Sequence, residues 1–452
     1  MRSLRLPASL LALALVVPAG AVFAVNTGQA DFTHYVAVGD SLTAGFTSNS
    51  LIDISQRIDY PALIQLQATG SNSGFQQPLV SPPGIPAILS LKGLFPAVIS
   101  PSSTNLGHPE NLNLPRPYDN LAVPGENVHS MINTVTDHGG LHDLILRGLG
   151  TQLQQAAASH PTFLTVWIGN NDALAAATSG IVIDGVTLTT LASFQADYTT
   201  IIHALASTGA KMALANIPDV TTIPFVNTIP PVVVNPHTNL PVMINGQMVP
   251  LIGPNGPLGA GDHVLLTAAA HLSQGIGIPL ALGGTGLPLA DSDVLSAAET
   301  AKVRARVQQF NGVIQAQANA VGAAYVDANA LLTQLATQGV EIGGLNFSSA
   351  FLTGGVFSYD GVHPTAFGYA FIANAFIAAI NAQFGADIPP ADESSAIFGT
   401  GSAGKQKRTA APAFGILTPE AIHQLFQAMN WPETGTLTSD PPPTHRRHHR
   451  AN

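Results

Sequence analysis

The chain of 452 residues is 46% apolar and only 9% charged, with a formal net charge of −10. The apolar content supplies a large core and argues against disorder over most of the length, which allows two or three domains or one domain with insertions. The acidic balance argues against nucleic acid as a partner, and the absence of cysteine excludes disulfides, thiolate catalysis and cysteine-bound zinc.

The first residues are typical of a signal peptide. Arg2 and Arg5 precede a short apolar run at residues 10–17, and residues 22–24 form a small-residue cleavage site. A membrane span needs about 20 apolar residues, so we expect residues 1–24 to be cleaved and the mature chain to start near Val25. This predicts a secreted or periplasmic protein, with an uncleaved membrane anchor as the alternative.

Apolar runs and helical segments then alternate along the chain. The expected strands lie at residues 35–38, 163–168, 212–217 and 323–326, and the expected helices at 196–207, 296–320 and 365–382. Ser296 and Glu299 form a capping box at the start of the second helix. Strands and helices in this rhythm predict an α/β fold built from βαβ units around a parallel sheet. We expect the last helix to pack Phe367, Phe371 and Phe376 against that sheet.

Two segments interrupt this rhythm, and a third follows it. Residues 71–117 and 220–292 are rich in Pro and Gly and are interpreted as insertions in a single domain spanning 25–385. Asn245-Gly246 in the second insertion predicts a tight hairpin. Residues 386–452 are expected to form a mostly flexible tail, whose truncation should leave stability and turnover nearly unchanged.

Four short blocks carry residues suited to nucleophilic catalysis. Ser41 follows the first strand in Gly39-Asp40-Ser41, and a serine at a strand-to-helix turn would expose its hydroxyl and aim its N–H along the helix dipole. Asp360 stands three residues before His363, close enough to orient an imidazole and stabilise its charged form. Taken alone, the first block also fits a helix N-cap, and the second fits a plain turn before a helix.

The other two blocks offer hydrogen-bond donors. Asn171, in Gly169-Asn170-Asn171-Asp172 at a strand end, has an amide that could donate to an oxyanion. Gly125 closes the block at residues 120–125, where a glycine lets a backbone N–H approach a substrate oxygen. An Asx-turn and a turn glycine are the alternative interpretations of these two residues.

Taken together and in this order, the blocks resemble the GDSL, or SGNH, hydrolase family. Ser41, Gly125 and Asn171 match the family's serine, glycine and asparagine, and Asp360 with His363 matches its Asp-x-x-His pair. The resemblance covers roughly residues 33–384. It implies a three-layer α/β/α, flavodoxin-like fold with a mostly parallel central sheet, in which the insertions exceed those of a minimal member.

The resemblance also implies a chemistry, namely hydrolysis of carboxylic esters by a lipase or esterase without metal or cofactor. His363, oriented by Asp360, removes the proton of Ser41, which attacks the ester carbonyl and forms an acyl-enzyme. The oxyanion is held by the N–H groups of Ser41 and Gly125 and by the Asn171 amide. Because residues 220–292 are poor in charge, we expect a lipid or aliphatic ester as the substrate.

Other functions stay open at this point. A carbohydrate acetylesterase of the same family would use the same residues, and a secreted binding protein could have lost the activity. An α/β-hydrolase is disfavoured by Thr43, which stands where its elbow needs glycine. A metallophosphoesterase would need clustered metal ligands, and the sequence shows no such clustering of its histidines. The basic end with Arg446, Arg447 and Arg450 suggests weak association with an anionic cell surface.

Overall fold

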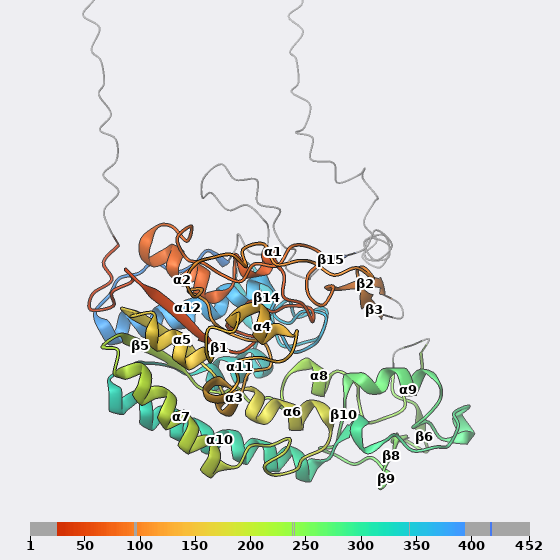
Figure 1. Ribbon diagram of the computed structural model, residues 1–452. Coiled ribbons are helices and arrows are strands. Elements are labelled where there is room, and N and C mark those ends of the chain that lie inside the picture. The colour runs from red at the N-terminus through yellow and green to blue at the C-terminus, as the bar shows by residue number, and fades with distance from the viewer. Residues whose placement is uncertain are drawn as a thin grey trace, which may run out of the picture.

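The computed structural model describes residues 25–94, 97–236, 238, 240–342, 344–393 and 416–417. The expected signal peptide, residues 1–24, and the basic C-terminal end lie outside these residues. The described chain forms a sheet-centred body from which the segment around residues 224–290 extends to one side (Figure 1).

The central sheet is parallel throughout and has the order β1-β4-β5-β12. Its strands are β1 (Tyr35–Gly39), β4 (Phe163–Trp167), β5 (Lys211–Ala215) and β12 (Ala324–Val326). Every residue of β1 and β4 is buried, as expected for a parallel sheet covered on both faces. Asn120 pairs in parallel with Ala37 on the free edge of β1. If the Asn120 segment is counted as a strand and all five are renumbered in chain order, the sheet order is 2-1-3-4-5, as in flavodoxin-like folds.

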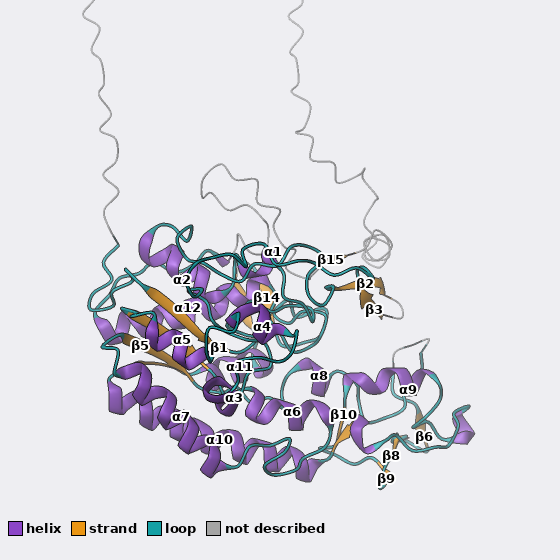
Figure 2. Ribbon diagram, in the orientation of Figure 1, coloured by secondary structure: helices purple, strands orange, loops and turns teal. Residues whose placement is uncertain are grey.

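Helices cover both faces of the sheet and confirm the predicted α/β class (Figure 2). On one face α2 (Tyr60–Thr69) packs against α12 (Ala366–Phe384), with the rings of Tyr60 and Phe376 stacked at 4.6 Å. On the other lie α3 (Val128–Asn133), α5 (Gln152–Ala158), α7 (Leu191–Ala206) and α10 (Ala297–Val321). The remaining helices are α1 (Asp53–Gln56), α4 (Leu141–Leu146), α6 (Asn171–Ser179), α8 (Pro224–Asn227), α9 (Ala269–Ser273) and α11 (Ala328–Thr337).

The predicted packing of the last helix is partly wrong. Phe376 lies in the core beside the sheet, whereas Phe367 stacks on Phe347 with ring centroids 3.8 Å apart. Phe371 packs at the edge of the small cluster that contains Phe347 and Phe367. Residues 367 and 376 are nine apart, and nine steps of about 100° place them on opposite sides of a helix. By length and composition alone α12 could span a membrane, but Tyr369, Phe376 and Ile380 are buried in the core.

The two insertions form small structures of their own. In the first, β2 (Leu89–Leu94) and β3 (Ala97–Pro101) form a hairpin, and β15 (Ile416–Leu417) pairs with β2 as a third strand. In the second, β6 (Met243–Ile244) and β7 (Gln247–Met248) flank the Asn245-Gly246 turn, where both φ angles are positive, as predicted. β8 (Ile252–Gly253) also pairs with β9 (Gly256–Pro257) inside this insertion, and β10 (His263–Val264) pairs with β11 (Val294–Leu295) just after it. Outside both insertions, β13 (Val340–Ile342) pairs with β14 (Leu345–Phe347).

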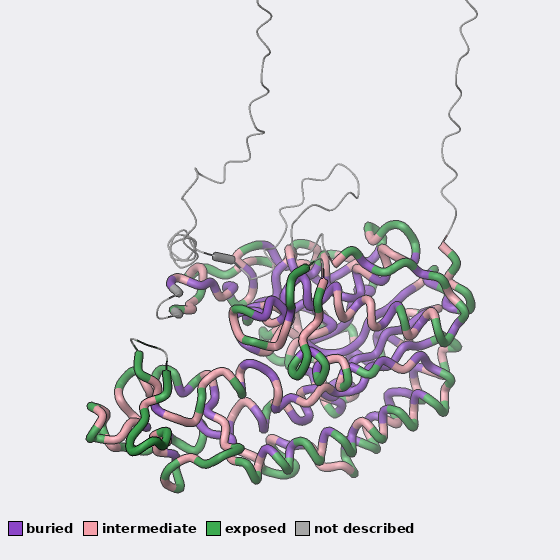
Figure 3. Tube along the Cα trace, turned by 180° about the vertical axis from the view of Figure 1, so that it is seen from behind, coloured by how far each residue is buried: buried purple, intermediate pink, exposed green. Residues whose placement is uncertain are grey.

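Burial distinguishes the body from the second insertion. Buried residues gather along the sheet, whereas the end of the insertion is mostly exposed or half-buried (Figure 3). The insertion has only a small core of its own, which includes Val233, Leu251 and Leu289. Beyond the expected domain end at 385, Ile388 and Ala391 are buried against α12. The packed chain therefore continues to about residue 393.

Candidate active site

Ser41 lies in a run of tight turns directly after β1. The N–H groups of Thr43 and Ala44 donate to the carbonyl of Asp40, and one carboxylate oxygen of Asp40 accepts from Leu42 N–H at 3.0 Å. The predicted strand-to-helix turn is wrong, because residues 41–45 form turns and the next helix, α1, starts only at Asp53. The turn residues, rather than a helix dipole, therefore set the direction of the Ser41 N–H.

Ser41, His363 and Asp360 form one hydrogen-bonded chain. The Oγ of Ser41 lies 2.9 Å from Nε2 of His363, and Nδ1 of His363 lies 2.8 Å from Oδ2 of Asp360. In the tautomer that donates from Nδ1 to Asp360, Nε2 can accept the hydroxyl proton of Ser41. Two residues 322 positions apart in sequence are thus in contact, because the end of β1 and the turn before α12 meet at the same edge of the sheet.

Asp360 is held by donors on several sides. Its Oδ1 accepts from the backbone N–H groups of Val362 and His363, at 2.9 and 2.8 Å, and its Oδ2 accepts from Asn49 N–H at 2.7 Å. Burial alone would raise the pKa of Asp360, but the charge of His363 and these hydrogen bonds outweigh it and lower the pKa. The carboxylate therefore stays ionised beside the imidazole.

The sequence patterns did not single out the loop that supports this pair. Ser48 and Asn49 both have positive φ, at 46° and 59°. Ser48 N–H donates to the hydroxyl of Ser358 at 2.8 Å, and the edge of the Phe46 ring lies against His363. Asn tolerates the left-handed region better than most residues, which is a faint signal for Asn49, but nothing local marks Ser48 or Ser358.

The segments that carry the predicted oxyanion donors contact residues next to Ser41. Val123 N–H donates to the carbonyl of Gly39 at 3.1 Å, which places the following turn beside the serine. Gly125 has φ +88°, and a Cβ added there would meet nothing within 4 Å. Among the described residues, no protein acceptor is found for the N–H of Ser41 or Gly125. One amide hydrogen of Asn171 goes to the carbonyl of Glu126 at 2.8 Å, which leaves its second donor available.

Buried carboxyl groups also surround this side of the site. Asp40 accepts from the Asn170 amide at 2.8 Å, and Asp172 accepts from Val128 N–H at 3.0 Å. Burial raises the pKa of Asp40 to about 6 and that of Asp172 to about 7. These groups are therefore harder to ionise than Asp360.

An apolar pocket opens beside Ser41 and His363. The open space inside it measures about 740 Å³, including the solvent-filled region at its mouth. Apart from Ser41, Asn170 and His363, its walls are apolar residues and Gly368. They come from β4, α6, the start of the second insertion, α11, the 356–364 turn and α12, and include Trp167, Leu174, Pro218, Ile223, Leu331, Leu335, Val356 and Phe371.

A family comparison agrees with this geometry. The model of GDSL-like lipase/acylhydrolases matches residues 35–376, which is most of the chain. The chain belongs to this family. The matched region contains Ser41, Gly125, Asn171, Asp360 and His363, and the resemblance drawn from the sequence is thereby confirmed.

A comparison with solved structures matches an acetylxylan esterase and a lipase/acylhydrolase. One is an acetylxylan esterase from Geobacillus stearothermophilus, at 13% identity, covering 76% of this chain and 93% of that one, with a TM-score of 0.33. Another is the lipase/acylhydrolase from Enterococcus faecalis, at 13% identity, covering 79% and 98%, with a TM-score of 0.32. A search of curated protein sequences finds no significant match.

The described residues include no group of three or more His, Asp or Glu side chains arranged to hold a metal ion. His34, His129, His142 and His263 lie apart from one another, and the first three each have an acidic partner within 4 Å. The ligand clusters that a two-metal phosphoesterase needs are not present in this part of the chain.

Proposed function

We propose that the protein is a serine carboxylic ester hydrolase that forms an acyl-enzyme on Ser41. The observation that carries this proposal is the hydrogen-bonded chain from Asp360 through His363 to Ser41 at the mouth of the apolar pocket. His363 takes the serine proton as Oγ attacks the ester carbonyl, then gives it to the leaving alcohol. Water repeats the sequence and frees the acid.

The oxyanion that forms during each attack needs donors already in place. The N–H groups of Ser41 and Gly125 and the second amide hydrogen of Asn171 are the proposed donors. Asp360, held ionised, stabilises the imidazolium of His363 without taking its proton. All of these steps use only the protein's own side chains and backbone.

The substrate that this pocket favours carries an aliphatic acyl chain. Burying apolar surface contributes about 25 cal/mol per Å², and the walls offer such surface along most of their length. An acetyl group is too short to reach most of these apolar residues. We therefore propose a lipid or other aliphatic ester rather than a carbohydrate acetyl ester.

Replacing the nucleophile tests the reaction. Ser41→Ala should lower turnover of a chromogenic ester by about 10⁴-fold or more, with the thermal midpoint little changed, because the variant keeps the turn and loses one hydroxyl. The rates are compared with EDTA present throughout. Retention of more than a trace of activity in the variant would exclude Ser41 as the nucleophile.

A panel of esters from acetyl to long chain tests the substrate. The wild type should give its highest kcat/KM on chains of several carbons, and Leu331→Trp should reduce it more for long chains than for acetyl, since Leu331 lines the pocket. Leu280→Trp is the matched control, because Leu280 is 73% exposed on the insertion. A preference for acetyl esters that Leu331→Trp leaves unchanged would favour the carbohydrate acetylesterase.

We further propose that the protein is exported. The apolar N-terminal run of residues 10–17 and its cleavage site support this, and Asn26, just after that site, already packs on the domain through a bond from Asp387 N–H. Retention at an anionic surface through Arg446, Arg447 and Arg450 stays a proposal. Sequencing the N-terminus of the secreted protein checks the first point.

A further inference from the structure

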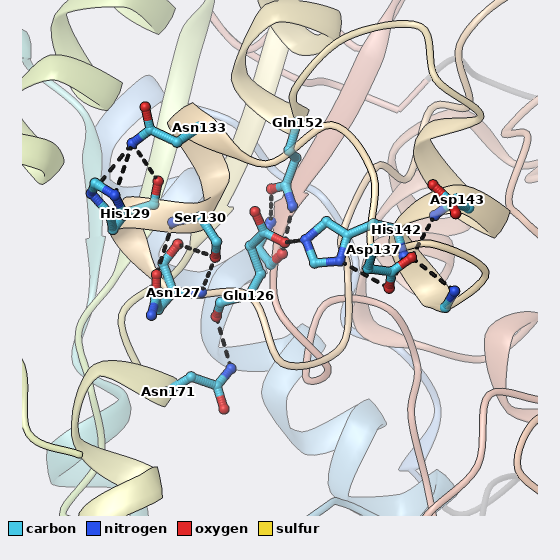
Figure 4. Close-up of polar contacts among 12 residues, drawn as sticks. Glu126, Asn127, His129, Ser130, Asn133, Asp137, His142, Asp143, Gln152 and Asn171 are labelled. Carbon is cyan, nitrogen blue, oxygen red and sulfur yellow. Dashed lines mark hydrogen bonds and ion pairs between the residues drawn. The ribbon is translucent and has the colours of Figure 1, made fainter. Parts of the chain in front are cut away.

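Besides Asp360 and His363, another carboxylate–imidazole pair lies next to the side of the site that carries Gly125 and Asn171, called the oxyanion side below. Glu126 directly follows Gly125, and its side chain is completely buried. Its Oε2 lies 2.6 Å from Nε2 of His142, whose other ring nitrogen lies 3.3 Å from Oδ2 of Asp137 (Figure 4). None of these three residues has a role in the mechanism above.

The loop before α4 fixes the orientation of His142. Asp137 accepts from the backbone N–H groups of Gly140 and His142, at 2.8 and 3.0 Å. A Cβ at Gly140 would lie 2.1 Å from the Asp137 carboxylate, so a side chain there would displace that carboxylate. Asp143 closes the same loop by accepting from Gly139 N–H. The imidazole thus reaches Glu126 from the first turn of α4, which these hydrogen bonds hold to the preceding loop.

Glu126 connects this turn to the proposed oxyanion donors. Its carbonyl accepts the amide hydrogen of Asn171 at 2.8 Å (Figure 4). Its own N–H donates to the carbonyl of Val123 at 3.0 Å. The next residue, Asn127, caps α3 by accepting from Ser130 N–H. Any shift of residue 126 therefore moves the acceptor that orients Asn171, together with the peptide of Gly125.

Charge gives a reason for His142 to be the partner. Burial raises the pKa of Glu126, and the Glu126 contact raises the pKa of His142. An unpaired carboxylate this close to Asp40 and to a forming oxyanion would oppose the negative charge of the reaction. Beside His142 the buried group is neutralised without leaving its position.

We infer that Glu126 and His142 are positioning residues that hold the Gly125 peptide and the Asn171 amide in the geometry needed to bind the oxyanion. The inference rests on the proposed ester hydrolysis. Because the oxyanion exists only in and near the transition state, loss of this support lowers kcat and leaves substrate binding nearly unchanged.

Steady-state kinetics on a soluble ester test the pair. Glu126→Ala and His142→Ala should each lower kcat about 10-fold to 100-fold with KM changed less than about threefold. Glu126→Gln keeps an acceptor for His142 and should stay within about threefold of the wild type. The double variant Glu126→Ala/His142→Ala should lose no more than either single variant, because the two act as one unit.

The chain offers a matched control on α3. His129 is exposed and lies 3.1 Å from Asp197, so His129→Ala removes a His–Asp pair that does not reach the oxyanion side. Its kcat should equal that of the wild type. If Glu126→Ala does not fold, Glu126→Asp replaces it, since the shorter side chain draws the carboxylate back from His142 and should also lower kcat.

Three outcomes would overturn the inference: kcat unchanged in both alanine variants, a loss of kcat that Glu126→Gln does not restore, or a rise in KM without a fall in kcat. A wild type without ester hydrolysis would instead sink the proposed function. The two failures are therefore distinguishable.

Discussion

The two sides of the site treat their carboxyl groups in opposite ways. Beside His363, hydrogen bonds and the imidazole charge lower the pKa of Asp360 despite its burial. On the oxyanion side, burial raises the pKa of Asp40 to about 6 and of Asp172 to about 7, and it raises that of Glu126 as well. Both sides are buried, so burial alone does not explain the difference.

The number of backbone donors and the sign of the charge to be stabilised explain it. Asp360 accepts three backbone N–H bonds and faces an imidazole that becomes positive in the proposed reaction. In the same reaction the oxyanion side holds a developing negative charge, and ionised carboxylates there would raise its free energy. The raised pKa values favour the neutral forms of Asp40 and Asp172, and His142 compensates the charge of Glu126, so both effects lessen that opposition.

Among changes to the two sides, removing the charge of Asp360 beside His363 and Ser41, the nucleophile side, should lower kcat the most. Asp360→Asn keeps the shape of the side chain but no longer stabilises the His363 imidazolium, so kcat should fall by about 10²- to 10⁴-fold. Steady-state assays on a soluble ester measure this fall in kcat. Asp291→Asn, an exposed change outside the site, is the control. A fall of less than about threefold would show that Asp360 only shapes the turn.

Removing a donor on the opposite side should have a smaller effect. Asn171→Ala takes away one oxyanion donor and the bond to the Glu126 carbonyl, and kcat should fall by about 10²- to 10³-fold with KM little changed. Asn170→Ala provides a contrast, since the Asn170 amide donates one hydrogen to Asp40 rather than to the Glu126 carbonyl. A larger loss in Asn170→Ala than in Asn171→Ala would reverse the assignment of the donor.

The sequence could predict the nucleophile side better than the oxyanion side. Asp360 and His363 are three residues apart, so a single turn unites them and the motif is visible locally. Glu126 and His142 are 16 positions apart, one in a loop and the other at the start of the short helix α4, and nothing in either segment indicates that they meet. Asn49 reaches Asp360 across 311 positions, a contact that only the folded chain reveals.

The strands were predicted well for a related reason. β1 and β4 are buried on both faces, so they appear as unbroken apolar runs that local sequence displays directly. The predictions were wrong where packing between residues distant in sequence decides the structure. Phe367 turns to Phe347 rather than to the sheet, and the turns after Ser41 replace the expected helix. Nor does the composition after residue 385 show that Ile388 is still part of the core.

The smallest effect on turnover, and the clearest on stability, should come from Asp172. Its carboxyl has a pKa of about 7 in the folded chain, against about 3.9 for an unfolded aspartate. Ionisation is therefore easier after unfolding. The stability that the neutral carboxyl contributes is complete below about pH 4 and is lost as the pH rises to about 7. The total loss is on the order of a few kcal/mol.

Asp172→Asn cannot ionise and should escape this loss. Its amide oxygen can still accept from Val128 N–H, so near pH 4 it should be no more stable than the wild type. From pH 4 to 7 its free energy of unfolding should gain on the wild type steadily, and above pH 7 the gap should stop growing. Denaturant titrations across this range measure it. Asp360→Asn should show the reverse trend. In the wild type the lowered pKa of Asp360 stabilises the fold above about pH 4, and this stability is lost in acid. The variant lacks it, so its free energy of unfolding should fall behind that of the wild type as the pH rises. Parallel curves for the two variants would mean that the two sides of the site do not differ in the way described.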